Sequence, residues 1–120
     1  MVKTDICSST HRRSVYYRGE YMDNLDRIEN QVSKNNRKIN GIVQVLHASN
    51  VPVRGITEGN IDEDPMISLD KNCSIQIELG GRLSLSQDLP NGCIRGYPVR
   101  RTLGEVIHDY RGIPAEPPTP

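Results

Sequence analysis

The sequence predicts an α+β protein in which one long amphipathic helix precedes a small β-hairpin-rich region and a short C-terminal helix. Three observations lead to this prediction. Apolar residues recur at alternating steps of four and three between residues 21 and 47, apolar and polar residues alternate between 73 and 86, and a helix-capping sequence begins at Thr102. These patterns are typical of a helix, of paired strands and of a helix N-terminus.

The composition limits how such a chain can be stabilised. It has 120 residues, with eight prolines, ten glycines and five tyrosines but neither phenylalanine nor tryptophan, and 35% of its residues are hydrophobic. Large apolar side chains offset the entropy that a chain loses when it becomes ordered. We therefore expect no dense self-contained core, and we expect apolar surface to be buried between identical subunits.

Residues 1–20 are polar and carry four basic against two acidic side chains, whereas residues 55–80 carry one basic against six acidic. We expect the first segment to be an extended arm that is ordered only against a partner, with His11, Arg12 and Arg13 as attachment residues. A nucleic-acid-binding protein would usually concentrate basic residues on one face. The charge pattern instead suits contacts between proteins, and we expect no nucleic-acid partner.

The strongest pattern predicts a parallel coiled-coil stalk over residues 21–47. Its apolar stripe keeps a seven-residue period, charged residues occupy the other faces, and Pro52 follows its end. An amphipathic helix packed on its own domain is the alternative, but the narrow stripe favours the coiled coil. Val43 and Val45 broaden the apolar face where the helix would meet a following domain. The predicted oligomerisation residues are Tyr21, Leu25, Ile28, Val32, Asn35, Ile39, Ile42 and Leu46.

The residue types at the seam predict three chains. Isoleucine at d positions such as Ile28 and Ile42, combined with leucine at a positions, disfavours two-stranded parallel coils and favours three or four strands. We predict a homotrimer. Asn35 would occupy one core layer, where a polar residue fixes the register at some cost in stability. Replacing Asn35 by isoleucine should then stabilise the assembly.

The stretch Val32-Ser33-Lys34-Asn35 resembles a layer in the stalks of trimeric bacterial adhesins and viral fibres. The resemblance implies that three inward Asn35 side chains surround an anion on the trimer axis. It covers four residues, and Asn36 stands where the stalk motif commonly has threonine. An asparagine that sets the register without an ion is the alternative.

Residues 51–111 are predicted to form a small β-rich head. Apolar residues alternate with polar ones on both sides of Gly80-Gly81. A two-residue turn at these glycines would mix apolar and polar side chains on each face of the hairpin. We therefore predict an odd loop, either three residues pairing Leu79 with Leu83 or five pairing Ile77 with Leu83. The predicted head core is Ile75, Ile77, Leu79, Leu83 and Leu85.

The C-terminal part begins with a capping box. Thr102 and Glu105 have the spacing of that motif and predict a short helix over 102–111, followed by a proline-rich tail over 112–120. The tail fits the Arg-x-x-Pro-x-x-Pro form of polyproline ligands, and a rigid extended tail is the simpler interpretation.

No catalytic or cofactor motif is present, so we predict no enzyme, no cofactor and no metal. The acidic run at 62–64 lacks the spacing of a calcium loop and is interpreted as a solvated loop. Cys7, Cys73 and Cys93 have no metal-type spacing, and we expect a reducing compartment rather than a disulfide framework. We expect no membrane span and no signal peptide.

This layout predicts a structural assembly protein, a trimeric viral or phage fibre, spike or capsid-attached decoration protein. Its arm would attach to a larger assembly such as a capsid or tail, which would place it in the virion, and otherwise in the cytoplasm. The alternative is a soluble coiled-coil adaptor or regulatory protein that binds a partner through its basic arm or its proline-rich tail.

Overall fold

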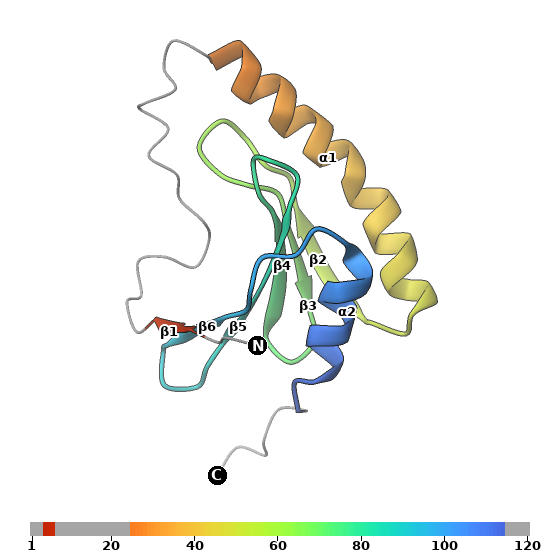
Figure 1. The fold of residues 1–120 in the computed structure, drawn as a ribbon, viewed down its shortest axis with the longest axis vertical. Helices are drawn as coiled ribbons and strands as arrows, with labels where there is room; N and C mark the ends of the chain where they lie inside the picture. The colour runs from red at the N-terminus through yellow and green to blue at the C-terminus, as the bar shows by residue number, and fades with distance from the viewer. Residues whose placement is uncertain (1–3, 7–24, 115–120) are drawn as a thin grey trace.

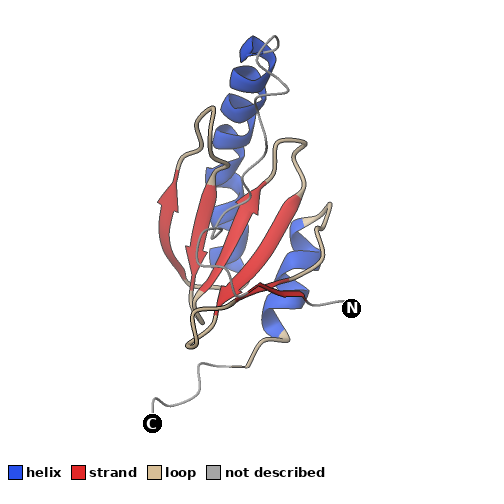
Figure 2. Cartoon of the chain, turned by 90° about the vertical axis from the view of Figure 1, so that its left-hand side faces the viewer, coloured by secondary structure: helices blue, strands red, loops and turns tan. Residues whose placement is uncertain are grey.

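The computed structural model describes residues 4–6 and 25–114. Two helices, α1 (Leu25–Ala48) and α2 (Leu103–Arg111), lie on one face of a six-stranded antiparallel sheet (Figures 1 and 2). The strand order is β1-β6-β5-β4-β3-β2. The predicted α+β class is therefore confirmed. The strands are β1 (Thr4–Ile6), β2 (Val53–Thr57), β3 (Met66–Leu69), β4 (Cys73–Ile77), β5 (Leu83–Asp88) and β6 (Ile94–Gly96).

The alternation in the strands follows from this two-layer arrangement. Ile67, Ile75 and Leu85 are direct neighbours across β3, β4 and β5, and all three are almost completely buried on the face covered by the helices. The adjacent row on the opposite face consists of half-buried serines. Successive side chains of a strand point to opposite faces, so only every second residue needs to be apolar.

The hairpin of β4 and β5 has a five-residue loop. Ile77 pairs with Leu83, and the Glu78 N–H donates to the Arg82 carbonyl at 2.8 Å inside the loop. The three-residue alternative, which pairs Leu79 with Leu83, is not the observed register. Leu79 lies in the loop and is half-buried, so it does not belong to the core, unlike the other four predicted head-core residues.

The chain has a dense core of its own, contrary to what the missing Phe and Trp led us to expect. Aliphatic side chains from both helices and the sheet form it, with Tyr97 and Tyr110 beside them. Close packing makes many small apolar groups sufficient, since each buried CH₂ contributes about 0.8 kcal/mol. The core residues that are no more than 2% exposed include Leu46, Val51, Ile67, Ile75, Ile77, Leu85 and Val106.

α1 packs its seven-residue stripe against its own chain. Ile39 and Leu46 belong to the same core as the sheet, and Ile28 and Val32 are 3% and 4% exposed. The helix and the sheet thus share one core, and the predicted division into a stalk over 21–47 and a separate head stays a prediction. The packing is that of the alternative, an amphipathic helix covering its own domain.

The remaining predicted oligomerisation residues differ from these. Leu25 is 36% exposed, Ile42 is partly buried against the core, and Tyr21 lies outside the described residues. A coiled coil built on the whole stripe would require α1 to leave the sheet. Among the described residues, neither helix is long and apolar enough to cross a membrane.

α2 begins with the predicted capping box. The Glu105 N–H donates to the Thr102 hydroxyl oxygen at 3.3 Å, and that hydroxyl lies 2.8 Å from Glu105 Oε1. The helix buries Val106, Ile107 and Tyr110 against the sheet. The apolar side of α2 is thus buried by residues of the same chain.

Candidate functional site

Asn35 connects α1 to the β4–β5 loop. The side chain is fully buried, and its Nδ2 donates to the Glu78 carbonyl at 2.9 Å and more weakly to the Leu79 carbonyl at 3.4 Å. Its Oδ1 accepts from Gln31 Nε2 at 3.1 Å. The amide donor that the stalk resemblance assigns to an axial anion is therefore engaged by carbonyls of its own chain. The anion site at Asn35 concerns an assembled trimer and stays a prediction.

Asn36 connects α1 to the β2–β3 loop. Its Nδ2 donates to the Gly59 carbonyl at 3.1 Å, and its Oδ1 accepts from the Gly59 N–H at 2.8 Å. A Cβ at Gly59 would lie only 2.5 Å from a side-chain carbon of Pro65, so the close approach requires glycine. Two adjacent asparagines thus attach two loops to the same stretch of helix. We call Asn35 and Asn36 the asparagine clamp.

The loop held by Asn36 is compact and acidic. The Asn60 N–H donates to the Glu63 carbonyl at 2.8 Å, and Asn60 Oδ1 accepts from the N–H groups of Asp62 and Glu63 at 2.8 and 3.0 Å. An asparagine that binds its own backbone in this way closes a tight turn. Glu58, Asp62 and Glu63 are exposed, as predicted for a solvated loop, whereas Asp64 is fully buried.

An open groove of about 430 Å³ lies between the C-terminal half of α1 and the start of α2. Ile42 and Val45 of α1 and Leu103 of α2 form apolar walls, and Val45 is 47% exposed. Lys38 and Arg101 stand at the groove, and none of its lining residues is acidic. We call this the helix groove. Its complete lining is Lys38, Gly41, Ile42, Val45, Gly81, Leu83, Arg101 and Leu103.

Two glycines keep the helix groove open. A Cβ at Gly41 would meet no atom within 4 Å, so packing inside the chain does not require glycine there. Glycine in a helix interior costs about 1 kcal/mol relative to alanine. Gly81 has a φ of +90°, and a Cβ there would lie 3.1 Å from Lys38 Nζ. The groove surface is thus backbone and aliphatic side chains with basic groups beside them.

A second hollow, of about 380 Å³, lies beside the β3–β4 turn and is occupied by structural contacts. Arg54 pairs with Asp70 across it. Lys71 Nζ donates to the carbonyls of Tyr110 and Ile113 at 3.2 and 2.6 Å and lies 4.3 Å from the centre of the Tyr110 ring. These contacts fasten the C-terminal end of α2 to the sheet. We therefore assign this hollow a structural role.

Arg100 and Asp109 form a buried ion pair. Arg100 Nε donates to Asp109 Oδ2 at 2.8 Å and its Nη2 donates to Oδ1 at 3.1 Å. The Asp109 side chain is fully buried, while that of Arg100 is 26% exposed. The hydrogen bond to Asp109 raises the pKa of the Arg100 guanidinium. The pair positions α2 against the segment before it, and Glu105 lies 3.6 Å from the same guanidinium.

The described cysteines differ in state. Cys73 is buried and free, and burial raises the pKa of its thiol to about 11. It stays protonated near neutral pH and is a poor nucleophile, since the thiolate is the reactive form. Cys93 is disulfide-bonded, although the sequence led us to expect a reducing compartment rather than a disulfide framework. Within residues 4–6 and 25–114, no three His, Cys, Asp or Glu side chains are grouped to hold a metal ion.

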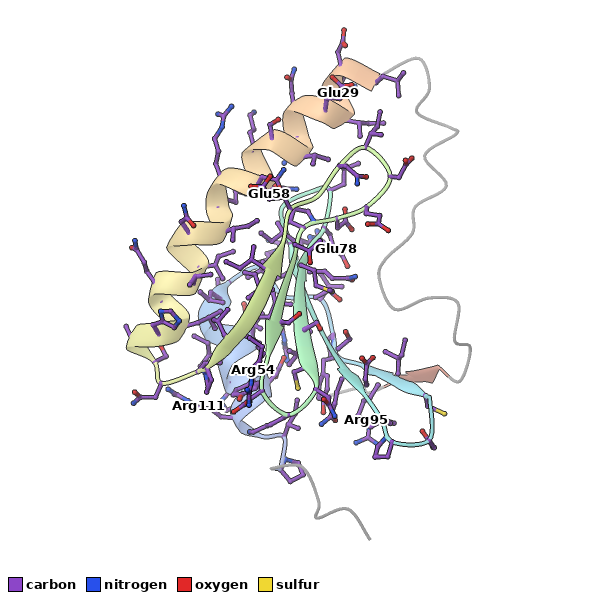
Figure 3. The ribbon with its side chains drawn as sticks, turned by 180° about the vertical axis from the view of Figure 1, so that it is seen from behind. Glu29, Arg54, Glu58, Glu78, Arg95 and Arg111 are labelled. Atoms are coloured by element: carbon purple, nitrogen blue, oxygen red, sulfur yellow. The ribbon has the colours of Figure 1, made fainter. Side chains whose placement is uncertain are left out.

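Six charged residues labelled in Figure 3 lie toward two ends of the molecule. Figure 3 shows Glu29, Glu58 and Glu78 toward the end that carries the N-terminal half of α1. Arg54, Arg95 and Arg111 lie toward the opposite end.

The sequence analysis missed the residues that define the helix groove. Lys38 and Arg101 look like ordinary surface charges, and Leu103 looks like part of a capped helix. The available signal was the broadened apolar face at Val45 together with Gly41, both outside the seven-residue stripe. The predicted arm residues His11, Arg12 and Arg13 and the tail beyond Pro114 lie outside the described residues.

No family model, curated protein or solved structure matches this chain.

Proposed function

We propose that this chain is a structural assembly protein that works as a homo-oligomer, in the manner of a viral or phage fibre, spike or capsid-attached decoration protein. The observation that carries the proposal is the helix groove. Its walls are aliphatic side chains, of which Val45 is exposed while Ile42 and Leu103 are partly buried, and charged groups stand beside them. An apolar centre with a polar rim is the usual anatomy of a protein–protein interface, and exposed apolar patches often mark such sites.

The side chains around the helix groove do not favour a catalytic function. Its polar lining groups are one lysine and one arginine, and the nearby ion pair of Arg100 and Asp109 is engaged in holding α2. General acid–base or nucleophilic catalysis would need a titratable pair aimed at a common point. Binding is the function that this surface supports better.

The trimeric coiled coil over residues 21–47 remains one form of this proposal. Because the stripe of α1 is buried against its own sheet, we favour an oligomer in which α1 keeps that packing and the helix groove makes the contact. Three copies remain the number that we propose. Attachment of the assembly to a larger particle through residues 1–20 would then place several weak sites on one rigid body, which raises the effective concentration of each.

Light scattering on the full chain over a range of concentrations tests the proposal. We expect an oligomer for the natural sequence and a smaller species for Val45→Gln, because a polar amide in the groove wall replaces apolar surface that a partner would bury. Glutamine is a good helix former, so α1 should stay folded. Val99→Gln is the matched control, since Val99 is 44% exposed and does not line the groove. A monomer at every concentration would contradict the proposal.

A further inference from the structure

We propose that the helix groove of one copy receives the segment from Ile56 to Asp62 of the next copy, so that one contact repeats head to tail. We call residues 56–62 the acidic segment. This inference rests on the proposed function, because it names the two surfaces through which the copies of a homo-oligomer would meet.

The helix groove selects an occupant with both apolar and acidic groups. Its walls are Ile42, Val45 and Leu103, and its charged groups are Lys38 and Arg101. Burying a partner there would leave these two cations without water unless carboxylates accompanied the apolar surface. A basic or purely apolar partner would fit the groove poorly.

The acidic segment offers this combination. Ile56 is 48% exposed, slightly more than Val45 and Val99, which are exposed hydrophobic residues too. Glu58 follows two residues later, and residues two apart in an extended chain lie on the same side. Asp62 is exposed in the turn that follows. The Ile56 side chain would pack against the aliphatic walls of the helix groove. The carboxylates of Glu58 and Asp62 would pair with the basic groups beside those walls.

The chain holds the acidic segment in place before any partner binds. Asn36 fixes Gly59 through two hydrogen bonds, and Asn60 closes the turn through its own side chain. Ordering a loop at an interface normally costs free energy, and a loop that is already ordered avoids that cost. The asparagine clamp thus gives the segment a fixed shape beside α1.

Direct strand pairing at β2 is a less suitable route to assembly. β2 is an edge strand, but its pairing with β3 is interrupted by a bulge between Val53 and Gly55, and Pro52 precedes it. Bulges, prolines and charges are the features that discourage edge-to-edge pairing. The second copy is therefore expected to engage the side chains of the acidic segment rather than extend the sheet.

The two surfaces are different parts of each copy, so the contact is heterologous. The acidic segment spans the end of the edge strand β2 and the loop after it (Figure 1). The helix groove is lined instead by residues of α1, of the β4–β5 loop and of the start of α2. Repeating such a contact gives a closed ring when the rotation fits and a filament when it does not. A three-membered ring is the closed form that agrees with the proposed copy number.

Charge reversal on the two surfaces tests this pairing. The groove variant carries Lys38→Glu with Arg101→Glu, and the segment variant carries Glu58→Lys with Asp62→Lys. We expect each variant alone to associate at least tenfold more weakly than the natural chain, because its two surfaces then carry like charges. An equal mixture should recover association through contacts between unlike variants. Because a ring of three cannot alternate two variants, open dimers should replace the closed ring in that mixture.

Arg27→Glu with Lys34→Glu is the matched control, since both residues are exposed on α1 and neither lines the groove. Circular dichroism checks the fold of each variant. If the reversals disturb it, Lys38→Gln with Arg101→Gln and Glu58→Gln with Asp62→Asn replace them, with several-fold weaker association expected in each.

The outcomes separate the two proposals. Variants that assemble like the natural chain, or a mixture that stays apart, would overturn the pairing while leaving the homo-oligomer intact. A natural chain that is monomeric throughout would instead remove the proposed function itself.

Discussion

Asn35→Asp is the substitution that most directly tests the packing of α1 against its own chain. The two side chains have nearly the same shape, but aspartate replaces the amide donor with a carboxylate oxygen. That oxygen would face the Glu78 carbonyl, which accepts a hydrogen bond at 2.9 Å in the natural chain. The site is fully buried, so water cannot replace the lost donor.

The expected decrease in the free energy of unfolding follows from these contacts. Leaving one buried polar group without its partner costs about 1–3 kcal/mol, and the second bond, at 3.4 Å to Leu79, adds little. Placing a carboxylate beside carbonyls at a dry site adds a desolvation cost. We expect the free energy of unfolding to fall by about 3 kcal/mol at pH 7. For a domain of this size that corresponds to about 12–24 °C in the melting temperature.

The loss should shrink in acid. Burial disfavours the charged form, so the pKa of the introduced carboxyl in the folded state should exceed its unfolded value of about 3.9. The penalty is then present at neutral pH and disappears as pH falls below that raised pKa, where the neutral acid can donate a hydrogen bond to the carbonyl. The difference in the free energy of unfolding between Asn35→Asp and the natural chain should therefore become smaller from pH 7 toward pH 4.

Urea unfolding followed by circular dichroism, at a concentration below that of association, measures this effect. Asn40→Asp is the control, because Asn40 is exposed on the same helix and should change stability by less than about 0.5 kcal/mol. The packing of α1 in the structure would be refuted if Asn35→Asp were neutral. It would also be refuted if Asn35→Ile raised stability in a concentration-dependent way, as a coiled-coil layer predicts.

Two further predictions concern other buried groups. Asp109→Asn should lower the free energy of unfolding by about 2–4 kcal/mol in the same assay, because it removes the buried charge that pairs with Arg100. The control is Asp26→Asn, which changes an exposed residue and should have little effect. Raising the pH from 9 to 11 should destabilise the chain by about 2 kcal/mol through Cys73, because the folded state holds its pKa at about 11 against an ordinary value of 9.0, so the unfolded thiol loses its proton first. This part of the pH dependence should be absent in Cys73→Ala, and its persistence there would exclude Cys73 as the cause; burial also raises the pKa of Tyr97 and Tyr110, which adds a decline above pH 10 in both proteins.

The local patterns of the sequence determined the elements. The long helix, the strand–loop–strand unit with one apolar face and the capped helix after Thr102 are all present in the structure. These features depend on residues close together along the chain, as in the contact between Thr102 and Glu105 or the pairing of Ile77 with Leu83. The spacing of apolar residues also showed that one stripe of α1 must be buried.

Only the tertiary structure decided what buries that stripe. A seven-residue period is equally compatible with a partner helix and with a sheet of the same chain, because it describes one surface and not its neighbour. Ile39 and Leu46 meet residues of β3, β4 and β5 that lie more than twenty positions further along the sequence. The role of Asn35 changed for the same reason, since its partner is a carbonyl 43 residues away.

The helix groove likewise exists only in the folded chain, because α2 and the β4–β5 loop complete it from distant segments. The sequence by itself determined which surfaces are apolar and where the chain turns, since neighbouring residues control both. Which surfaces meet, and which remain exposed for a partner, depends on how segments far apart in sequence close on one another.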